Sequence, residues 1–225
     1  MYELIEHLKK KQWLWQGNHT PESRDHHSTG FDLLDQKLEG GFPIHGVVEL
    51  QTTSGIGELR LLLPHLKNSS QGRLSVFIQP PGHLSAQSLT AEGLDLNHIL
   101  LLYPKTDNEA LWAAEQCLKS GACSNVLLWH SGLEVHHARR LQVASETGNC
   151  LSFLFKTEQR SLFSLPVSLS MTLLPHPLGI EITITKRKGG WPHASFVLDM
   201  STLWPSLTES RPEPVILPFP LRKQG

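Results

Sequence analysis

The chain has 225 residues, with 39% hydrophobic and 18% charged residues, which is typical of one α/β domain with terminal extensions. Its formal net charge is −1, so contact with nucleic acid would need a local basic patch. No apolar run approaches the ~18–20 residues that span a bilayer, and the first residues do not read as a signal peptide. We therefore expect a cytoplasmic protein without membrane contact.

Residues 1–27 are predicted to form a helical arm followed by a polar linker. Apolar residues recur from Leu4 and include Trp13 and Trp15, which is typical of a short amphipathic helix. An arm of this length cannot bury two tryptophans by itself. Trp13 and Trp15 are therefore predicted to dock either on the core of this chain or on a partner protein.

Residues 28–200 alternate apolar runs with helical patterns, which predicts βαβ units and a largely parallel sheet. The predicted strands are 47–51, 74–79, 99–102, 126–129 and 151–155, followed by a half-exposed strand near 180–185. Gly189 and Gly190 are then predicted to turn the chain toward residues 196–198. The predicted helices are 58–67, 86–92, 108–120 and 134–146, with Asn108 as a helix cap.

Residues 201–225 are rich in proline and are predicted to form an extended tail. Leu217, Phe219 and Leu221 concentrate apolar groups on this segment. Such a peptide suits a groove on another protein. The alternative is a strap that lies over the domain's own surface.

Residues 52–59 occupy the place of a phosphate-binding loop between a predicted strand and a predicted helix. Such a loop reads G-x-x-x-x-G-K-[ST], and its backbone N–H groups, lysine and hydroxyl bind phosphates and magnesium. Gly55 and Gly57 are present, but Thr52 replaces the first glycine, Glu58 the lysine and Leu59 the hydroxyl. A carboxylate repels a triphosphate, so we expect the loop's shape without its chemistry and no bound cofactor.

The order of motifs resembles the RecA-like ImuA family, which serves mutagenic translesion DNA synthesis. Residues 28–50, with their Ser-Thr-Gly and Gly-Gly-Phe-Pro motifs, resemble the entry to a RecA-type core. The resemblance to ImuA itself rests on residues 57–64, on 109–112 with 118–124, on 139–142 and on 186–192. It implies a RecA-like core over residues 28–200. The shorter SulA cell-division inhibitors have a related pattern.

The resemblance also points to two further positions that an ATPase of this kind would need. The strand 74–79 should end near a glutamate that activates water, but it runs into Gln79, Pro80 and Pro81. The strand 126–129 should end on a magnesium-binding aspartate, but His130 follows it. Phosphoryl transfer depends on positioning and on charge compensation, so the sequence predicts no enzyme activity. The histidines lack metal-ligand spacing, and we expect no metal.

The densest basic cluster is Lys186, Arg187 and Lys188, followed by Trp191. Cations beside an aromatic ring can bind a phosphate backbone and stack a base. The alternative is a solvated strand end. The sequence leaves both interpretations open, and a weak contact with single-stranded DNA is the functional one.

The resulting hypothesis is a non-catalytic accessory protein of SOS-induced translesion synthesis that acts through protein contacts. The resemblance implies an ImuB-like homologue of Y-family polymerases as partner, an error-prone replicative-type polymerase bound indirectly, and RecA as a further partner. One alternative is a SulA-like inhibitor that binds the division GTPase FtsZ. A second is a RecA-type DNA-binding ATPase.

Overall fold

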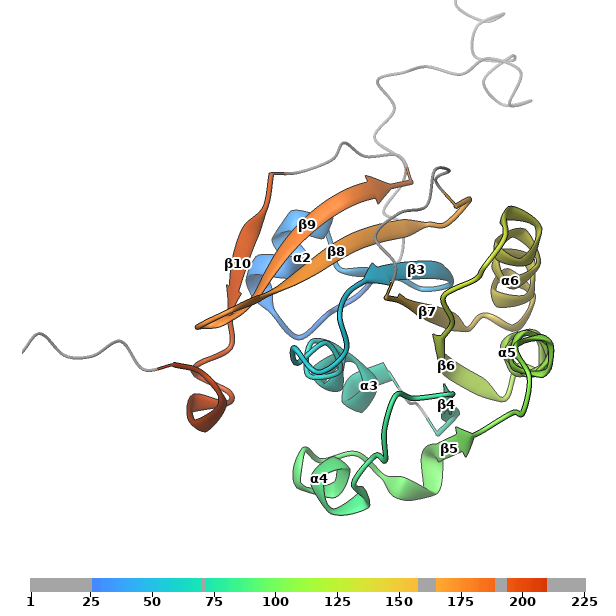
Figure 1. The fold of residues 1–225 in the computed structure, drawn as a ribbon, viewed down its shortest axis with the longest axis horizontal. Coiled ribbons are helices and arrows are strands. Elements are labelled where there is room, and N and C mark those ends of the chain that lie inside the picture. Colours follow the sequence, from blue (N-terminus) through green and yellow to red (C-terminus); the bar gives the residue numbers. More distant parts are fainter. Residues whose placement is uncertain (1–25, 70–71, 158–164, 189–193, 210–225) are drawn as a thin grey trace, which may run out of the picture.

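In the computed structural model, residues 26–69, 72–157, 165–188 and 194–209 are described (Figure 1). They form an eight-stranded sheet in the order β10-β9-β8-β3-β7-β6-β4-β5, and a separate ribbon of β1 and β2. Neighbours from β8 to β5 are parallel, whereas β8, β9 and β10 pair antiparallel. The predicted α/β class with a mostly parallel sheet flanked by helices is confirmed.

The elements follow one another closely along the chain. The strands are β1 (His26–His27), β2 (Phe42–Pro43), β3 (Gly46–Gln51), β4 (Leu74–Ile78), β5 (Ile99–Leu102), β6 (Cys123–Trp129), β7 (Leu151–Lys156), β8 (Leu169–His176), β9 (Gly179–Arg187) and β10 (Phe196–Asp199). The helices are α2 (Asp32–Leu38), α3 (Leu63–Ser69), α4 (Ala86–Ala91), α5 (Asp107–Lys119) and α6 (Val135–Gly148), with single 3₁₀ turns η1 (Leu96–His98) and η2 (Pro205–Leu207).

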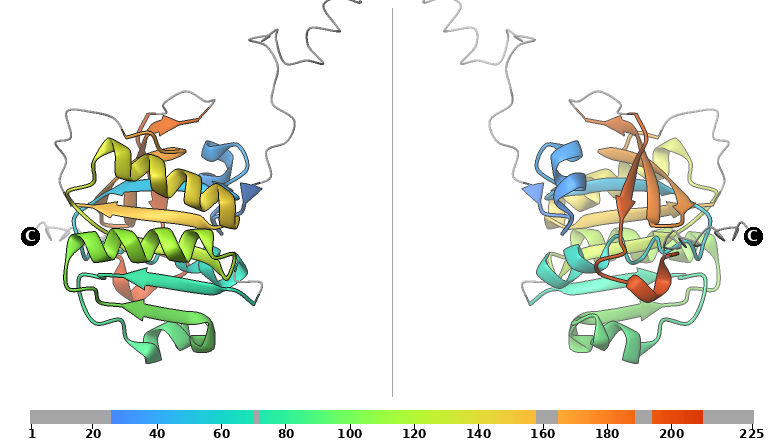
Figure 2. Two further views of the ribbon diagram at one scale, coloured as in Figure 1. Left: turned by 90° about the vertical axis from the view of Figure 1, so that its right-hand side faces the viewer. Right: turned by 90° about the vertical axis from the view of Figure 1, so that its left-hand side faces the viewer.

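Helices cover both faces of the sheet, as Figure 2 shows. The amphipathic helices α5 and α6 bury their apolar faces on one side, and α2, α3 and α4 pack on the other. The central strands are therefore apolar on both faces. In β6, Val126 and Leu128 contact the α5–α6 side while Leu127 contacts the α3 side, as expected for a covered parallel sheet.

The helix after the loop is shorter than the predicted range 58–67. It begins at Leu63, and residues 54–62 form successive turns. Pro64 explains the difference, because a helix that began at Glu58 would place this proline in its interior, without an N–H and in collision with the Arg60 carbonyl. Starting at Leu63 puts Pro64 in the first turn, where its missing N–H has no helical partner to lose.

Helix α5 matches its predicted range closely, but its predicted cap is wrong. Thr106, not Asn108, caps it, because the Thr106 hydroxyl accepts from the Glu109 N–H while Glu109 Oε2 accepts from the Thr106 N–H. This reciprocal capping box satisfies two backbone donors at the helix start. Glu109 is thus a structural residue of the helix end.

The antiparallel extension of the sheet consists of β8, β9 and β10. Strand β9 was predicted, whereas β8 was missed. Ile180, Ile182 and Ile184 of β9 are buried and alternate with more exposed neighbours, which confirms the predicted half-exposed strand. Strand β8 was not predicted, because Ser170, Thr172 and Pro175 interrupt its apolar pattern. Leu169, Met171 and Leu173 nevertheless alternate with the period of a strand.

Residues 201–209 lie on the core rather than forming the start of an extended tail. Trp204 is buried, and its indole N–H donates to Glu92 Oε1 at 2.7 Å, beside α4. The Glu209 N–H donates to the Pro177 carbonyl at 2.8 Å. Residues 210–225 and 1–25 lie outside the described residues, so the predicted division into 1–27, 28–200 and 201–225 stays a prediction.

Candidate functional site: the loop at the carboxyl end of β3

The degenerate loop leaves β3 at the edge of the sheet where the parallel strands end. Thr52 is buried, and its N–H donates to the Lys156 carbonyl at 2.9 Å, which continues the pairing of β3 with β7. Gly55 and Gly57 have φ values of 89° and 95°, a left-handed conformation that favours glycine. The loop therefore keeps its two glycines for a backbone reason that does not depend on a nucleotide.

The carboxylate of Glu58 is folded back into this loop. The Gly55 N–H donates to both carboxylate oxygens, at 3.0 and 3.1 Å, and Glu58 is only 6% exposed. A phosphate-binding loop would direct such N–H groups at a phosphate. Here an internal anion uses the Gly55 N–H, and Leu59 packs against the main core instead of offering a hydroxyl.

The ends of the neighbouring strands add no catalytic carboxylate. Gln79 follows β4 in a left-handed conformation with φ of 53°, and its amide donates to the Pro104 carbonyl at 3.4 Å. His130 follows β6 and is 8% exposed, and neither ring nitrogen has a hydrogen-bond partner among the described residues. Burial lowers the pKa of His130 below its usual value, so the imidazole is neutral near pH 7.

Together these strand ends line a pocket of about 230 Å³. Asp107, at the start of α5, supplies the carboxylate among the described lining residues, and Lys156 supplies the ammonium group. This lysine is not available to a phosphate, since its Nζ lies 3.2 Å from Glu49 Oε1 and both side chains are almost fully buried. The pocket therefore has polar walls without an uncompensated positive charge.

The Glu49–Lys156 ion pair belongs to a buried polar network that joins four strands. The Ser170 hydroxyl on β8 donates to Glu49 Oε2 at 2.7 Å, and the Thr185 hydroxyl on β9 donates to Ser170 Oγ at 3.0 Å. A buried ion pair needs such additional hydrogen bonds to offset the cost of removing two charges from water. Sequence analysis missed this network, although a glutamate inside the apolar run of β3 was a visible signal.

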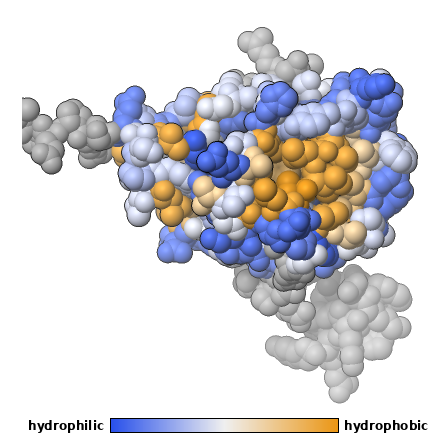
Figure 3. All heavy atoms as spheres, turned by 90° about the horizontal axis from the view of Figure 1, so that it is seen from below, coloured by the Kyte–Doolittle hydropathy of each residue, from blue (hydrophilic) through white to orange (hydrophobic). Residues whose placement is uncertain are grey.

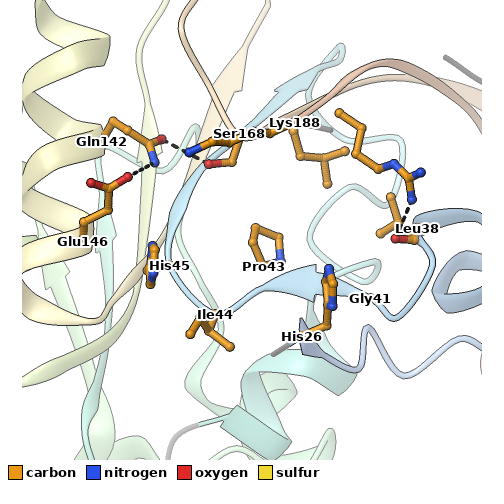
Figure 4. A pocket seen from close by; sticks show the side chains of 12 residues that line it. His26, Leu38, Gly41, Pro43, Ile44, His45, Gln142, Glu146, Ser168 and Lys188 are labelled. Carbon is orange, nitrogen blue, oxygen red and sulfur yellow. Dashed lines mark hydrogen bonds between the residues drawn. The ribbon is translucent and has the colours of Figure 1, made fainter. Parts of the chain in front are cut away.

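The predicted basic cluster is engaged within the chain. The Lys186 ammonium donates to the Leu165 carbonyl at 2.5 Å. Arg187 donates to the Leu38 carbonyl at 2.9 Å and lies 2.6 Å from Glu39 Oε1. Lys188 lines a pocket (Figure 4), and Trp191 lies outside the described residues. The DNA contact stays a prediction, and two of its cations have structural partners.

That second pocket lies at the amino end of β3, far along the strand from the degenerate loop, and has about 350 Å³. Figure 4 shows Gln142 and Glu146 of α6 on one side, Leu38 on the other and Pro43 between them. Gln142 accepts from the Val47 N–H at 3.0 Å, donates to Glu146 at 2.9 Å and accepts from the Ser168 hydroxyl. These contacts fix the α6 wall, and no sequence pattern indicated the pocket.

The predicted partner-binding residues Trp13, Trp15, Leu217, Phe219 and Leu221 lie outside the described residues. Among the residues that are described, no group of three or more His, Cys, Asp or Glu side chains could hold a metal ion. Within the same part of the chain, no helix combines the length and apolarity that crossing a membrane requires.

The fold and the loop define a mixed α/β protein in which the loop after β3 holds the internal carboxylate of Glu58 against the Gly55 N–H. The profile of the family described as "Cell division inhibitor SulA" matches residues 39–152, about half of the chain. The chain therefore belongs to the SulA family. The match runs from just before β2 to the start of β7 and leaves β8, β9 and β10 outside it.

Similar proteins include both SulA and RecA sequences. SulA of Photorhabdus laumondii is 35% identical over 103 residues, which cover 45% of this chain and 58% of that protein. SulA of Cronobacter sakazakii is 31% identical over 104 residues, which cover 45% and 62%. RecA of Crocosphaera subtropica is 30% identical over 102 residues, which cover 45% and 29%. The chain thus spans about three fifths of these SulA proteins. The crystal structure of SulA from Pseudomonas aeruginosa is 28% identical, has a TM-score of 0.42 and covers 49% of this chain and 98% of that one.

Proposed function

We propose that this protein is a non-catalytic, RecA-like accessory protein of the ImuA kind that serves SOS-induced mutagenic translesion DNA synthesis. The observation that carries the proposal is Glu58, whose buried carboxylate accepts the Gly55 N–H at the centre of a phosphate-loop position. A protein with this loop responds to its partners rather than to a nucleotide. It would work in the cytoplasm, without a cofactor.

Two features favour the ImuA kind over a shorter inhibitor. The sheet continues beyond the region of the SulA match into β8, β9 and β10. The buried network of Glu49, Lys156 and Ser170 then ties this extension to β3 and β7, so the extension is part of the core. Similarity to RecA over 102 residues supports a RecA-like origin of the core.

The proposed partners are an ImuB-like Y-family polymerase homologue, an error-prone replicative-type polymerase reached through it, and RecA. The arm residues Trp13 and Trp15 and the tail residues Leu217, Phe219 and Leu221 are proposed to supply part of the contact. Apolar segments this short bury little surface by folding on their own, and they bury more when they dock on a partner's surface.

The proposal is tested by co-purification of the full chain with an ImuB-like homologue of Y-family polymerases from the same organism. We expect a stable complex that forms without nucleotide and weakens when residues 205–225 are removed or Trp13 and Trp15 become alanine. A matched control is Trp112→Ala, which changes a tryptophan on α5 that is already exposed. Failure of the wild-type chain to bind, with damage-induced mutagenesis unchanged by deletion of the gene, would overturn the proposal.

A second candidate is a SulA-like inhibitor of cell division that binds FtsZ, and the family match over residues 39–152 specifically favours it. Expression of the full chain would then cause filamentous growth, and the purified protein would lower FtsZ assembly in a sedimentation assay. Normal division and unchanged assembly, together with a complex with the polymerase homologue, would favour the ImuA kind.

A further inference from the structure

Strand β5 is the open edge of the sheet. It pairs with β4 alone, and β4 in turn lies against β6. The Leu102 carbonyl faces β4, because it accepts from the Gln79 N–H at 3.0 Å. Peptide groups alternate in direction along a strand, so the Leu101 peptide faces away from the sheet. The edge therefore presents backbone donors and acceptors with no strand beside them among the described residues.

The side chains at this edge are apolar and exposed. Leu100 and Leu101 are 38% and 37% exposed, and Leu96 and Tyr103 on either side are 41% and 55% exposed. Seen from below, the molecule shows a broad apolar patch (Figure 3). Edge strands are usually protected by lysine, proline or a bulge, whereas β5 reads Ile-Leu-Leu-Leu. The strand itself is short, and the protective residue types Pro104 and Lys105 follow only after its end.

Charge at the two ends of this edge is self-complementary. Asp95 precedes the strand, and its carboxylate is ordered by the Asn97 N–H at 3.0 Å and by His98 Nδ1 at 2.9 Å. Lys105 follows the strand. A second copy that ran antiparallel would bring the acidic end of one edge to the basic end of the other, twice by symmetry. A parallel arrangement would place like charges together.

We infer that β5 is an interface between two copies of this chain, paired antiparallel about a two-fold axis near Leu100. This register makes Leu100 face its own copy and pairs the outward peptides of Ile99 and Leu101 across the axis. It joins two sheets into one and covers the apolar patch. The inference rests on the edge itself and is independent of the proposed function.

Analytical ultracentrifugation of the full chain tests the interface. We expect wild type to sediment as a dimer and Leu100→Lys/Leu101→Lys to sediment as a monomer with an unchanged circular-dichroism spectrum. Val143→Lys is the matched control, since Val143 is exposed on α6, away from the edge, and it should remain dimeric. A monomeric wild type, or a double variant that stays dimeric, would overturn the inference.

Disulfide trapping checks the register without disturbing the edge. Directly opposed residues of an antiparallel pair place their Cβ atoms about 4.5–5.5 Å apart, which is near the range a disulfide accepts. Leu100→Cys should therefore form a covalent dimer on mild oxidation, and Val143→Cys should not. A Leu100→Cys protein that stays uncrosslinked while the dimer persists would contradict this pairing. An edge that binds a different protein but not a second copy of this chain would also contradict it.

Discussion

The loop at the carboxyl end of β3 and the edge strand β5 belong to the same sheet but differ in how their polar groups are satisfied. In the loop, the Gly55 N–H is satisfied by Glu58, and the nearby Lys156 is satisfied by Glu49. At β5, backbone groups and leucines face outward. The polar groups of the loop are thus satisfied within the chain, whereas the edge of β5 has no strand beside it among the described residues.

The largest expected effect comes from breaking the buried ion pair behind the loop. Lys156→Met leaves Glu49 charged and buried without its partner, which should cost about 3–5 kcal/mol of unfolding free energy. Denaturant unfolding measures it. The double variant Glu49→Leu/Lys156→Met should recover most of the loss, since no buried charge remains. A single variant as stable as wild type would show that the pair is not buried as described.

Glu58→Ala tests whether the loop is held by its own carboxylate. Removing the acceptor leaves the Gly55 N–H without its partner, so we expect a loss of about 1–3 kcal/mol, measured by urea unfolding. Glu58→Gln keeps one acceptor oxygen and should lose less. If the alanine variant were more stable than wild type, the carboxylate would destabilise the loop rather than stabilise it.

The core beneath the loop should be sensitive to mild acid through His65. Its ring contacts the Ser28 carbonyl at 3.2 Å and Asn125 Oδ1 at 3.0 Å, and burial lowers its pKa from the usual value of about 6.5. The folded protein thus binds this proton less readily than the unfolded chain. Stability is fully present above about pH 6.5 and should fall as the pH drops below it. A thermal-unfolding series against pH should show this slope in wild type and a weaker one in His65→Gln.

The smallest expected effect concerns the basic cluster. Each lost phosphate contact lowers the salt slope of single-strand binding by about 0.7, and we propose such contacts for Lys186, Arg187 and Lys188. Because Lys186 and Arg187 also bind Leu165, Leu38 and Glu39 within the chain, their replacement should reduce stability as well. Salt titrations of wild type and the triple alanine variant, each paired with an unfolding curve, separate the two effects. An unchanged slope would leave the cluster structural.

Much of the fold could be read from local pattern. Buried parallel strands are continuous apolar runs, so β3, β4 and β5 fell close to their predicted ranges. The predicted start of one helix was wrong for a local steric reason, since Pro64 makes α3 begin at Leu63. Strand β8 was not predicted because its polar residue Ser170 donates to a partner, Glu49, that lies 121 positions away in the sequence.

The candidate site, like the fold, was only partly predictable from the sequence. The replacement of lysine by Glu58 was visible in the sequence, and it predicted a loop without phosphate chemistry. The contact between Glu58 and Gly55 depends on a turn conformation that residue types alone do not specify. The exposure of β5 depends on which strand ends the sheet, a property of topology that the Ile-Leu-Leu-Leu pattern cannot reveal.

Nucleotide turnover tests the closed loop most directly. Purified wild-type protein should neither hydrolyse ATP nor bind it in calorimetry, with or without single-stranded DNA, because the buried Glu58 carboxylate accepts the Gly55 N–H within the loop and we predict that His130 replaces a magnesium-binding carboxylate. Gly57→Val serves as the background control. Hydrolysis by wild type that single-stranded DNA stimulates and Gly57→Val abolishes would contradict a loop closed by its own carboxylate.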